Sequence, residues 1–412
     1  MHKLRTFTLF FKRPVFFTGI FLILLAFNSC TNSKNIASFE DESLFSLKYG
    51  NFNDELNLFD LQNPGNVNTR MTMRGGFFYI VNGESKKIME MSSYGDLLTL
   101  YCADEQNTTT GANAMSATFK TINYPFNEIS LVTTDSRKCL YVVDKLPVER
   151  REEDENTKQM LTQIILRFDS DGNFINYIGQ QGQGGTPFPV ISNIYTTEQN
   201  ELVVVTKKQD GLGIYWYSDS GKLRYTIDFN KDTVPNPHAE KLGDNSFMMI
   251  SNAIPDSTKD VLYLMVNYYS AYIDEASRVQ AGIDYDETLI YPIQLEDGTY
   301  DKAITIPPYT QEIFEGFTKI THDIPYDFIG ITRSGWFYFL LSTETGFQVQ
   351  MVQINGQRII KRALPVNHSE NLYFAYSLSD TGILSALLAK KDKVNLVWWR
   401  TDQLIDDILS VN

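Results

Sequence analysis

The strongest constraint on the fold is a short unit that occurs twice in succession between residues 164 and 227. When the two copies are aligned on Gly172 and Gly221, their apolar positions coincide. The coincident pairs are Ile165 with Ile214, Phe168 with Tyr217, Phe174 with Leu223, and Ile178 with Ile227. Each copy reads as an alternating strand, a turn rich in Asp, Ser and Gly, and a second alternating strand. Period-two alternation around such a turn predicts a β-hairpin.

The same element recurs along the chain and divides it into six units. They are predicted at about 67–101, 124–179, 190–229, 239–306, 324–364 and 372–400. Units of about four short strands, repeated at intervals of ~40 to 70 residues, are typical of propeller blades that are stable only when stacked. Strands that are apolar almost throughout, such as 261–266, indicate burial on both faces of a sheet. The sequence therefore predicts an all-β, six-bladed propeller.

The sixth unit has only three obvious strands, so the ring needs a fourth strand from elsewhere. We expect an N-terminal strand, at 43–49 or at 56–61, to supply it. The alternative is a seven-bladed ring in which residues 43–61 open an additional blade.

Four segments resemble the repeat of NHL-type six-bladed propellers: Ile194 to Thr196, Leu202 to Val205, Phe168 to Gly172, and Gly179 to Gly185. They match a strand that begins with Ile and ends in Thr or Ser, a strand like Leu-Val-Val-Val, a hairpin containing Phe-Asp-x-x-Gly, and a Gly-rich exit. The resemblance covers about three blades. It implies the same fold, and NHL-like propellers include lactonases and lyases that hold calcium or zinc in the central channel.

The N-terminus has the features of an export signal. Residues 2–13 are basic, and 15–27 form an uncharged, almost wholly apolar run of 13 residues, shorter than the ~20 that span a bilayer. Cys30 follows a small residue, as in the lipobox of bacterial lipoproteins, although Phe27 and Asn28 depart from that motif. We expect a lipoprotein signal peptide at 1–29, a lipid on Cys30, a polar tether at 30–36 and a single propeller domain at 37–412. The alternative is an ordinary cleaved signal.

These features predict a location in the bacterial cell envelope, on the periplasmic or outer-surface side. They also predict the membrane as a partner, through the lipid anchor. The whole chain has a formal net charge of −14, from 36 basic and 50 acidic residues. Removing residues 1–29, which hold four basic residues and no acid, leaves 32 basic and 50 acidic residues, or −18. So acidic a surface repels phosphate backbones, which argues against nucleic acid as a partner.

Few residues suggest chemistry. His238, His322 and His368 each precede the first strand of a predicted blade. In one interpretation all three face the central channel and are zinc ligands. The plainer interpretation is three surface histidines. Cys102 and Cys139 are either a disulfide of an exported protein or two small buried apolar side chains. No catalytic motif stands out, and the sequence predicts no cofactor.

The remaining irregular segments are interpreted as connections. Residues 103–121 read as a polar loop, 145–160 as a charged insertion and 271–287 as an acidic irregular piece, whereas 402–409 favour one or two helical turns. The preferred function is a binding or scaffold module whose face loops recognise a protein, peptide or glycan. The alternative is a propeller enzyme of the lactonase or lyase type with a metal in the central channel.

Overall fold

The computed structural model describes residues 36–58, 67–103, 119–274, 276–315 and 318–410. The chain divides into two units, 1–37 and 38–412. The predicted signal peptide and Cys30 lie outside the described residues. Within the part of the chain that is described, no helix is both long enough and apolar enough to cross a membrane.

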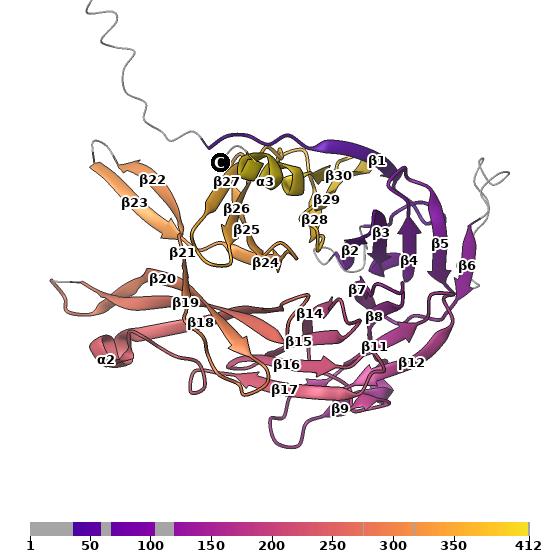
Figure 1. Cartoon of the computed structure of the whole chain (residues 1–412), viewed down its shortest axis with the longest axis horizontal. Coiled ribbons are helices and arrows are strands. Elements are labelled where there is room, and N and C mark those ends of the chain that lie inside the picture. The colour runs from indigo at the N-terminus through magenta and orange to yellow at the C-terminus, as the bar shows by residue number, and fades with distance from the viewer. Residues whose placement is uncertain (1–35, 59–66, 104–118, 275, 316–317, 411–412) are drawn as a thin grey trace, which may run out of the picture. The chain divides into compact units, whose positions relative to one another are not determined.

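In the described part of unit 38–412, six sheets of four or five strands are arranged as the blades of a propeller (Figure 1). Blade 1 contains β2 (Thr69–Arg74), β3 (Phe77–Asn82), β4 (Lys87–Met91), β5 (Leu97–Cys102) and β6 (Lys120–Asn123). Blade 2 contains β7 (Ile129–Thr134), β8 (Leu140–Lys145), β11 (Gln163–Phe168), β12 (Phe174–Gly179) and β13 (Gly182–Gln183). Blade 3 contains β14 (Ile191–Thr196), β15 (Leu202–Lys208), β16 (Gly211–Tyr217) and β17 (Leu223–Phe229).

The second half of the ring repeats this arrangement. Blade 4 contains β18 (Ser246–Pro255), β19 (Val261–Ile273), β20 (Gln280–Gln294) and β21 (Ile304–Ile306). Blade 5 contains β24 (Asp327–Ile331), β25 (Trp336–Thr343), β26 (Gly346–Gln353) and β27 (Ile359–Leu364). Blade 6 contains β28 (Tyr373–Leu378), β29 (Leu384–Ala389), β30 (Lys393–Trp399) and β1 (Glu42–Lys48). All six predicted units are therefore blades.

The N-terminal strand β1 closes the ring. It pairs antiparallel with β30 from Glu42, opposite Trp398, to Lys48, opposite Lys393. The first of the two predicted closing segments is thus confirmed. The seven-bladed alternative is wrong, because in the described residues β1 completes blade 6 instead of opening a sheet of its own.

Apolar side chains fill the interface between every pair of neighbouring blades. Strand β15 shows how one strand serves two interfaces. Val203 and Val205 point into the cluster shared with blade 4, whereas Leu202 and Val204 point into the cluster shared with blade 2. Because successive side chains of a strand point to opposite faces, a strand buried on both faces must be apolar throughout. The same alternation explains the run at 261–266.

Two turn predictions are confirmed at their glycines. Gly172 (φ +74°) and Gly221 (φ +83°) lie in the left-handed region that favours glycine, at the turns of the hairpins β11–β12 and β16–β17. The predicted C-terminal helix is α3 (Thr401–Ser410), whose Ile405 is buried against the interface between blades 5 and 6.

The prediction of an irregular piece at 271–287 is wrong. Strands β19 and β20 continue pairing through most of it, with Ala271 opposite Ile283 and Ile273 opposite Gln280. Most of these side chains are exposed, so backbone hydrogen bonds hold the hairpin and no buried face marks it in the sequence.

Four short helical elements and two small hairpins lie outside the six blade sheets in the described residues. The hairpins are β9 (Glu152–Glu153) with β10 (Met160–Leu161), and β22 (Tyr309–Glu315) with β23 (Thr318–Ile324). The other elements are η1 (Gly83–Ser85), η3 (Val148–Arg150), α2 (Ala239–Leu242) and η4 (Gly243–Asn245). Both hairpins, α2 and the end of the β19–β20 hairpin lie in connections between second and third strands or between blades. Antiparallel order places all such connections at one end of the ring, here called the insertion face. The opposite end, with the turns between first and second strands, is called the turn face.

Candidate binding channel

The first strands of the six blades, β2, β7, β14, β18, β24 and β28, surround a central cavity of about 1270 Å³. Its lining reaches Lys207, Asp210 and Lys231 at the insertion face, and Ser257 and Asp380 at the turn face. The cavity therefore runs along the inner strands, and we call it the channel.

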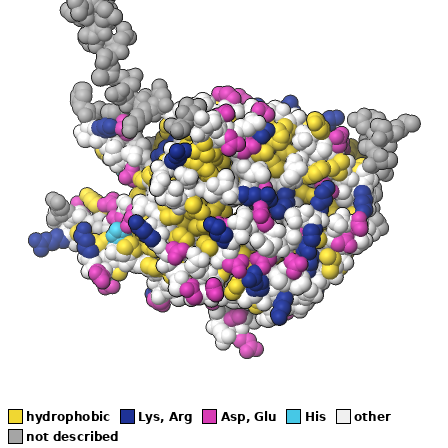
Figure 2. Space-filling model, in the orientation of Figure 1, with side chains coloured by type: hydrophobic (Ala, Val, Ile, Leu, Met, Phe, Trp, Pro, Cys, Tyr) yellow, Lys and Arg dark blue, Asp and Glu magenta, His cyan; other side chains and the backbone are white. Residues whose placement is uncertain are grey.

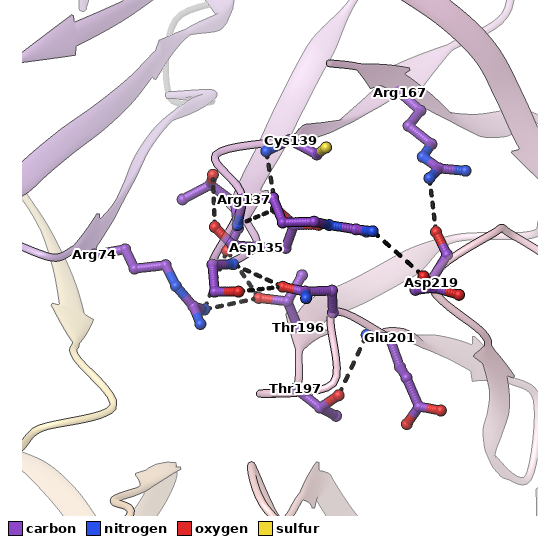
Figure 3. Close-up of polar contacts among 12 residues, drawn as sticks. Arg74, Asp135, Arg137, Cys139, Arg167, Thr196, Thr197, Glu201 and Asp219 are labelled. Carbon is purple, nitrogen blue, oxygen red and sulfur yellow. Dashed lines mark hydrogen bonds and ion pairs between the residues drawn. The ribbon is translucent and has the colours of Figure 1, made fainter. Parts of the chain in front are cut away.

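Hydrogen bonds join the inner strands of several neighbouring blades. Arg74 Nη1 donates to Thr134 O (3.2 Å) and to Thr196 Oγ1 (3.1 Å), so one side chain of blade 1 contacts blades 2 and 3 (Figure 3). Asn252 Nδ2 of blade 4 donates to Phe328 O of blade 5 (2.9 Å). Met73 N of blade 1 donates to Ser377 Oγ of blade 6 (3.2 Å). The inner wall is thus held in a defined geometry.

Ion pairs cross the turn face. Arg333 Nε of blade 5 lies 2.6 Å from Glu198 Oε1 of blade 3, and its Nη2 lies 2.6 Å from Asp380 Oδ2 of blade 6. Figure 3 shows a second network, in which Arg137 joins the buried Asp135 (3.0 Å) to Asp219 (3.3 Å). These contacts connect four blades at the turn face.

The channel carries a charge opposite in sign to the chain. Its charged lining residues are Arg70, Arg74, Lys207, Lys208, Lys231, Asp210, Asp327 and Asp380. Five cationic and three acidic side chains give a net charge of +2, whereas the chain carries −14. Figure 2 shows Lys and Arg side chains near the middle of the face in view, with hydrophobic side chains beside them.

Arg70 is the best-anchored cation near the insertion face. Its Nη1 donates to Val67 O (3.2 Å) and Thr69 O (3.0 Å) and also contacts the hydroxyl of Tyr373. The guanidinium carbon lies 5.9 Å from the centroid of the Tyr373 ring. Among the described residues, neither Arg70 nor Arg74 forms an ion pair with a carboxylate.

Tyr195 and Tyr376 line the same channel as Arg70. The Tyr376 side chain is 41% exposed, and the burial of its remainder, together with Asp327, raises its pKa, whereas Arg70 acts in the opposite direction. Burial also raises the pKa of Tyr195, on which Asn252 acts in the opposite direction. Both phenols are therefore neutral hydrogen-bond donors at neutral pH. Burial raises the pKa of Asp327 as well.

The three predicted histidines do not converge on the channel. His238 Nε2 lies 2.9 Å from Glu287 Oε1, and its ring packs on Tyr268. His322 is exposed on β23, opposite Gln311. His368 Nε2 lies 2.9 Å from Gly346 O. None of the three lines the channel, and in the described residues no three His, Cys, Asp or Glu side chains form a group that could hold a metal.

The two predicted disulfide partners lie in different blades. Cys102 ends β5 in blade 1 and is buried, whereas Cys139 precedes β8 in blade 2 and is half-buried. No disulfide joins them in the structure. The backbone N–H of Cys139 donates to the buried Asp135 Oδ1 (2.9 Å), so this residue belongs to the network at the turn face (Figure 3).

The channel residues were not predicted from the sequence, although β2 carries a signal for them. In β2, the polar residues Arg70, Thr72 and Arg74 alternate with the buried Met71 and Met73. An innermost strand has one face against a neighbouring blade, and polar residues at alternate positions of a first strand mark the channel side.

No protein-family model and no curated protein matches this chain. Solved structures resemble it in fold. A gluconolactonase from Xanthomonas campestris is 11% identical over 78% of this chain and 82% of its own, with a TM-score of 0.38. The polysaccharide lyase Uly1 is 8% identical over 87% and 99%, with a TM-score of 0.40. The propeller domain of the trilobed protease from Pyrococcus furiosus is 9% identical over 81% and 95%, with a TM-score of 0.37. At these identities the similarity concerns fold alone.

Proposed function

We propose that this protein is a lipid-anchored propeller of the cell envelope that binds a ligand in the channel, through the insertion face. The observation that supports this most is the channel itself, with a volume of about 1270 Å³ and a lining of arginines, tyrosines and amides. Sites for small ligands have volumes of roughly 300–1,000 Å³ and combine aromatic walls with a few placed polar groups. The channel has this chemistry and offers more room, which suits part of a glycan, a peptide or a protein loop.

The location of the insertions supports the same face. Two hairpins and helix α2 lie in connections at the insertion face, whereas ion pairs cross the turn face. Binding residues are often carried by loops on a rigid scaffold. The inner strands, fixed by hydrogen bonds between blades, are such a scaffold.

A binding screen tests this function. Labelled panels of glycans, peptides and envelope proteins are offered to the protein from residue 31 onward, with Tyr376→Ala as the channel variant. Tyr94→Ala is the matched control, because Tyr94 is 88% exposed and lies outside the channel. We expect Tyr376→Ala to weaken binding by about 5-fold or more, the size of a typical interface tyrosine. Equal binding by both variants contradicts a channel site.

The anchor is part of the proposal and has its own test. Cys30 is the residue that would carry the lipid, with 30–36 as the tether. We expect the full chain to fractionate with membranes and Cys30→Ala to be recovered in the soluble fraction. Membrane association that survives Cys30→Ala contradicts the lipid anchor.

The second candidate function is a lactonase- or lyase-type enzyme. It is favoured by the shared channel lining, which contains a carboxyl (Asp327), a phenol (Tyr376) and a guanidinium (Arg70), because general acid–base catalysis needs such groups in one site. Elemental analysis after dialysis without chelator, followed by turnover assays with lactones and acidic polysaccharides, separates the two functions. Turnover that is lost in both Asp327→Asn and Tyr376→Phe supports the enzyme, whereas binding without turnover supports the binding module.

A further inference from the structure

The charge of the channel narrows the choice of ligand. A net charge of +2 on the lining of a chain that carries −14 attracts anions into the channel and repels them from the remaining surface. Lys231 at the mouth is exposed, and it forms no ion pair among the described residues. The positively charged lining therefore attracts anionic ligands to the insertion face.

Arg70 is prepared to receive an acidic group. Every hydrogen bond that Arg70 makes within the described residues uses Nη1, which two backbone carbonyls hold in place. Neither Nη2 nor Nε takes part in those bonds, so both keep N–H groups for a ligand. A guanidinium fixed in this way matches a carboxylate or sulfate in a two-bonded geometry, and less conformational entropy is lost on binding.

The surroundings of Arg70 suit a sugar. The Tyr376 side chain, which is 41% exposed, presents an aromatic surface of the kind against which the C–H face of a pyranose packs. Asn193, which lines the channel, donates from Nδ2 to Asn252 Oδ1 (3.3 Å), whereas its Oδ1 accepts no hydrogen bond in the described part of the chain and is an acceptor for a sugar hydroxyl. An acidic peptide uses the charge but needs fewer of these neutral groups.

We infer that the channel binds an acidic oligosaccharide, with a carboxylate or sulfate on Arg70 and a sugar ring against Tyr376. This inference rests on the proposed function, since it specifies the ligand of the same channel. Asp327 and Asp210 disfavour a ligand with a negative charge at every position along the channel. An oligosaccharide in which charged and neutral units alternate fits both signs.

The experiment compares matched probes by calorimetry on the protein from residue 31 onward. The probes are tetrasaccharides that contain glucuronate, galacturonate or sulfated units. Each is paired with a neutral form, in which the carboxylates are reduced or the sulfates removed. Tetraglutamate is the acidic peptide probe. We expect an acidic tetrasaccharide to bind at least about 10-fold more tightly than its neutral form, the effect of one charge-assisted hydrogen bond. We also expect its affinity to fall as salt is raised from 0.05 to about 0.5 M.

Three variants locate the charge effect. Arg70→Gln is expected to remove at least about 10-fold in affinity for the acidic probe and little for the neutral one. Lys231→Gln, at an exposed mouth position, is expected to lower the affinity a few-fold without affecting folding. Arg358→Gln is the control, because Arg358 is exposed and outside the channel. Melting temperatures verify that the variants are folded.

Each outcome decides one level of the proposal. Equal affinity for acidic and neutral tetrasaccharides overturns charge selection but leaves a channel-binding function standing. If tetraglutamate binds more tightly than every acidic tetrasaccharide, the assignment of a sugar as the ligand is overturned. If none of the acidic tetrasaccharides binds, this inference is overturned. The binding screen with glycans, peptides and envelope proteins then decides the proposed function separately.

Discussion

Removal of β1 tests how the ring is closed. We compare a chain that begins at Glu42 with one that begins at Tyr49, which lacks β1 and its pairing with β30. Three apolar side chains leave the interface between blades 6 and 1: Leu47, which is 5% exposed, and the half-buried Leu44 and Phe45. Full burial of such a side chain contributes about 1.5–3 kcal/mol. One full and two half contributions give a loss of about 3–6 kcal/mol.

This loss is a large part of the ~5–15 kcal/mol by which a typical domain is stable. At roughly 2 °C per kcal/mol for a large domain, the melting temperature should fall by about 6–12 °C. Thermal unfolding followed by circular dichroism measures the shift. Size-exclusion chromatography should also show association of the shorter chain, because β30 becomes an unpaired edge. A monomeric chain from Tyr49 that melts within 2 °C of the longer chain would refute closure by β1.

Three smaller predictions concern buried groups. Burial lowers the pKa of Lys87 to about 8, so the unfolded chain binds more protons than the folded chain between pH 8 and 10.5. The free energy of unfolding should therefore rise with pH in this range, by up to about 3 kcal/mol relative to Lys87→Met. Parallel pH profiles of urea unfolding for the two proteins would contradict this. Gly346 has φ +136°, and an added Cβ would lie 2.3 Å from Leu364 O, so Gly346→Ala should cost about 3 kcal/mol. Gly298→Ala, with no atom within 4 Å, should cost about 1 kcal/mol, and equal losses in urea unfolding would refute the steric argument. The indole N–H of Trp216 donates to the buried Glu201 (2.8 Å). Glu201→Leu removes this acceptor and should lower the free energy of unfolding, measured by chemical denaturation, by about 1–3 kcal/mol more than Glu201→Gln does. Equal losses of stability would show that the indole finds another acceptor.

The fold could be predicted where burial leaves a pattern in the sequence. Strands such as β15 and β19 are apolar at successive positions because each face packs on a different blade. Turn glycines such as Gly172 fix the hairpins because few other residues adopt a positive φ. Exposed hairpins leave no such pattern, which is why the continued pairing of β19 with β20 and the hairpin β22–β23 were missed. The resemblance to NHL-type repeats stays a prediction.

The candidate site was harder to predict because it is assembled from distant parts of the chain. Arg70, Asp327 and Tyr376 belong to three blades and line one channel only after the ring closes. The histidines were proposed from their place before first strands, but each lies among different neighbours. Sequence position gives the blade and the strand of a residue. It does not give the direction from which a loop side chain approaches the channel.

The closing strand also determines how the propeller can unfold. An open array of repeats has terminal units with only one neighbour, and these fray first. Here the first and last strands of the ring domain, β1 and β30, lie in one sheet, so every blade is packed between two others. Loss of any one blade exposes the apolar surfaces of both its neighbours. The ring therefore has no weak end, and a polypeptide nicked between two blades would still be held on both sides of the cut.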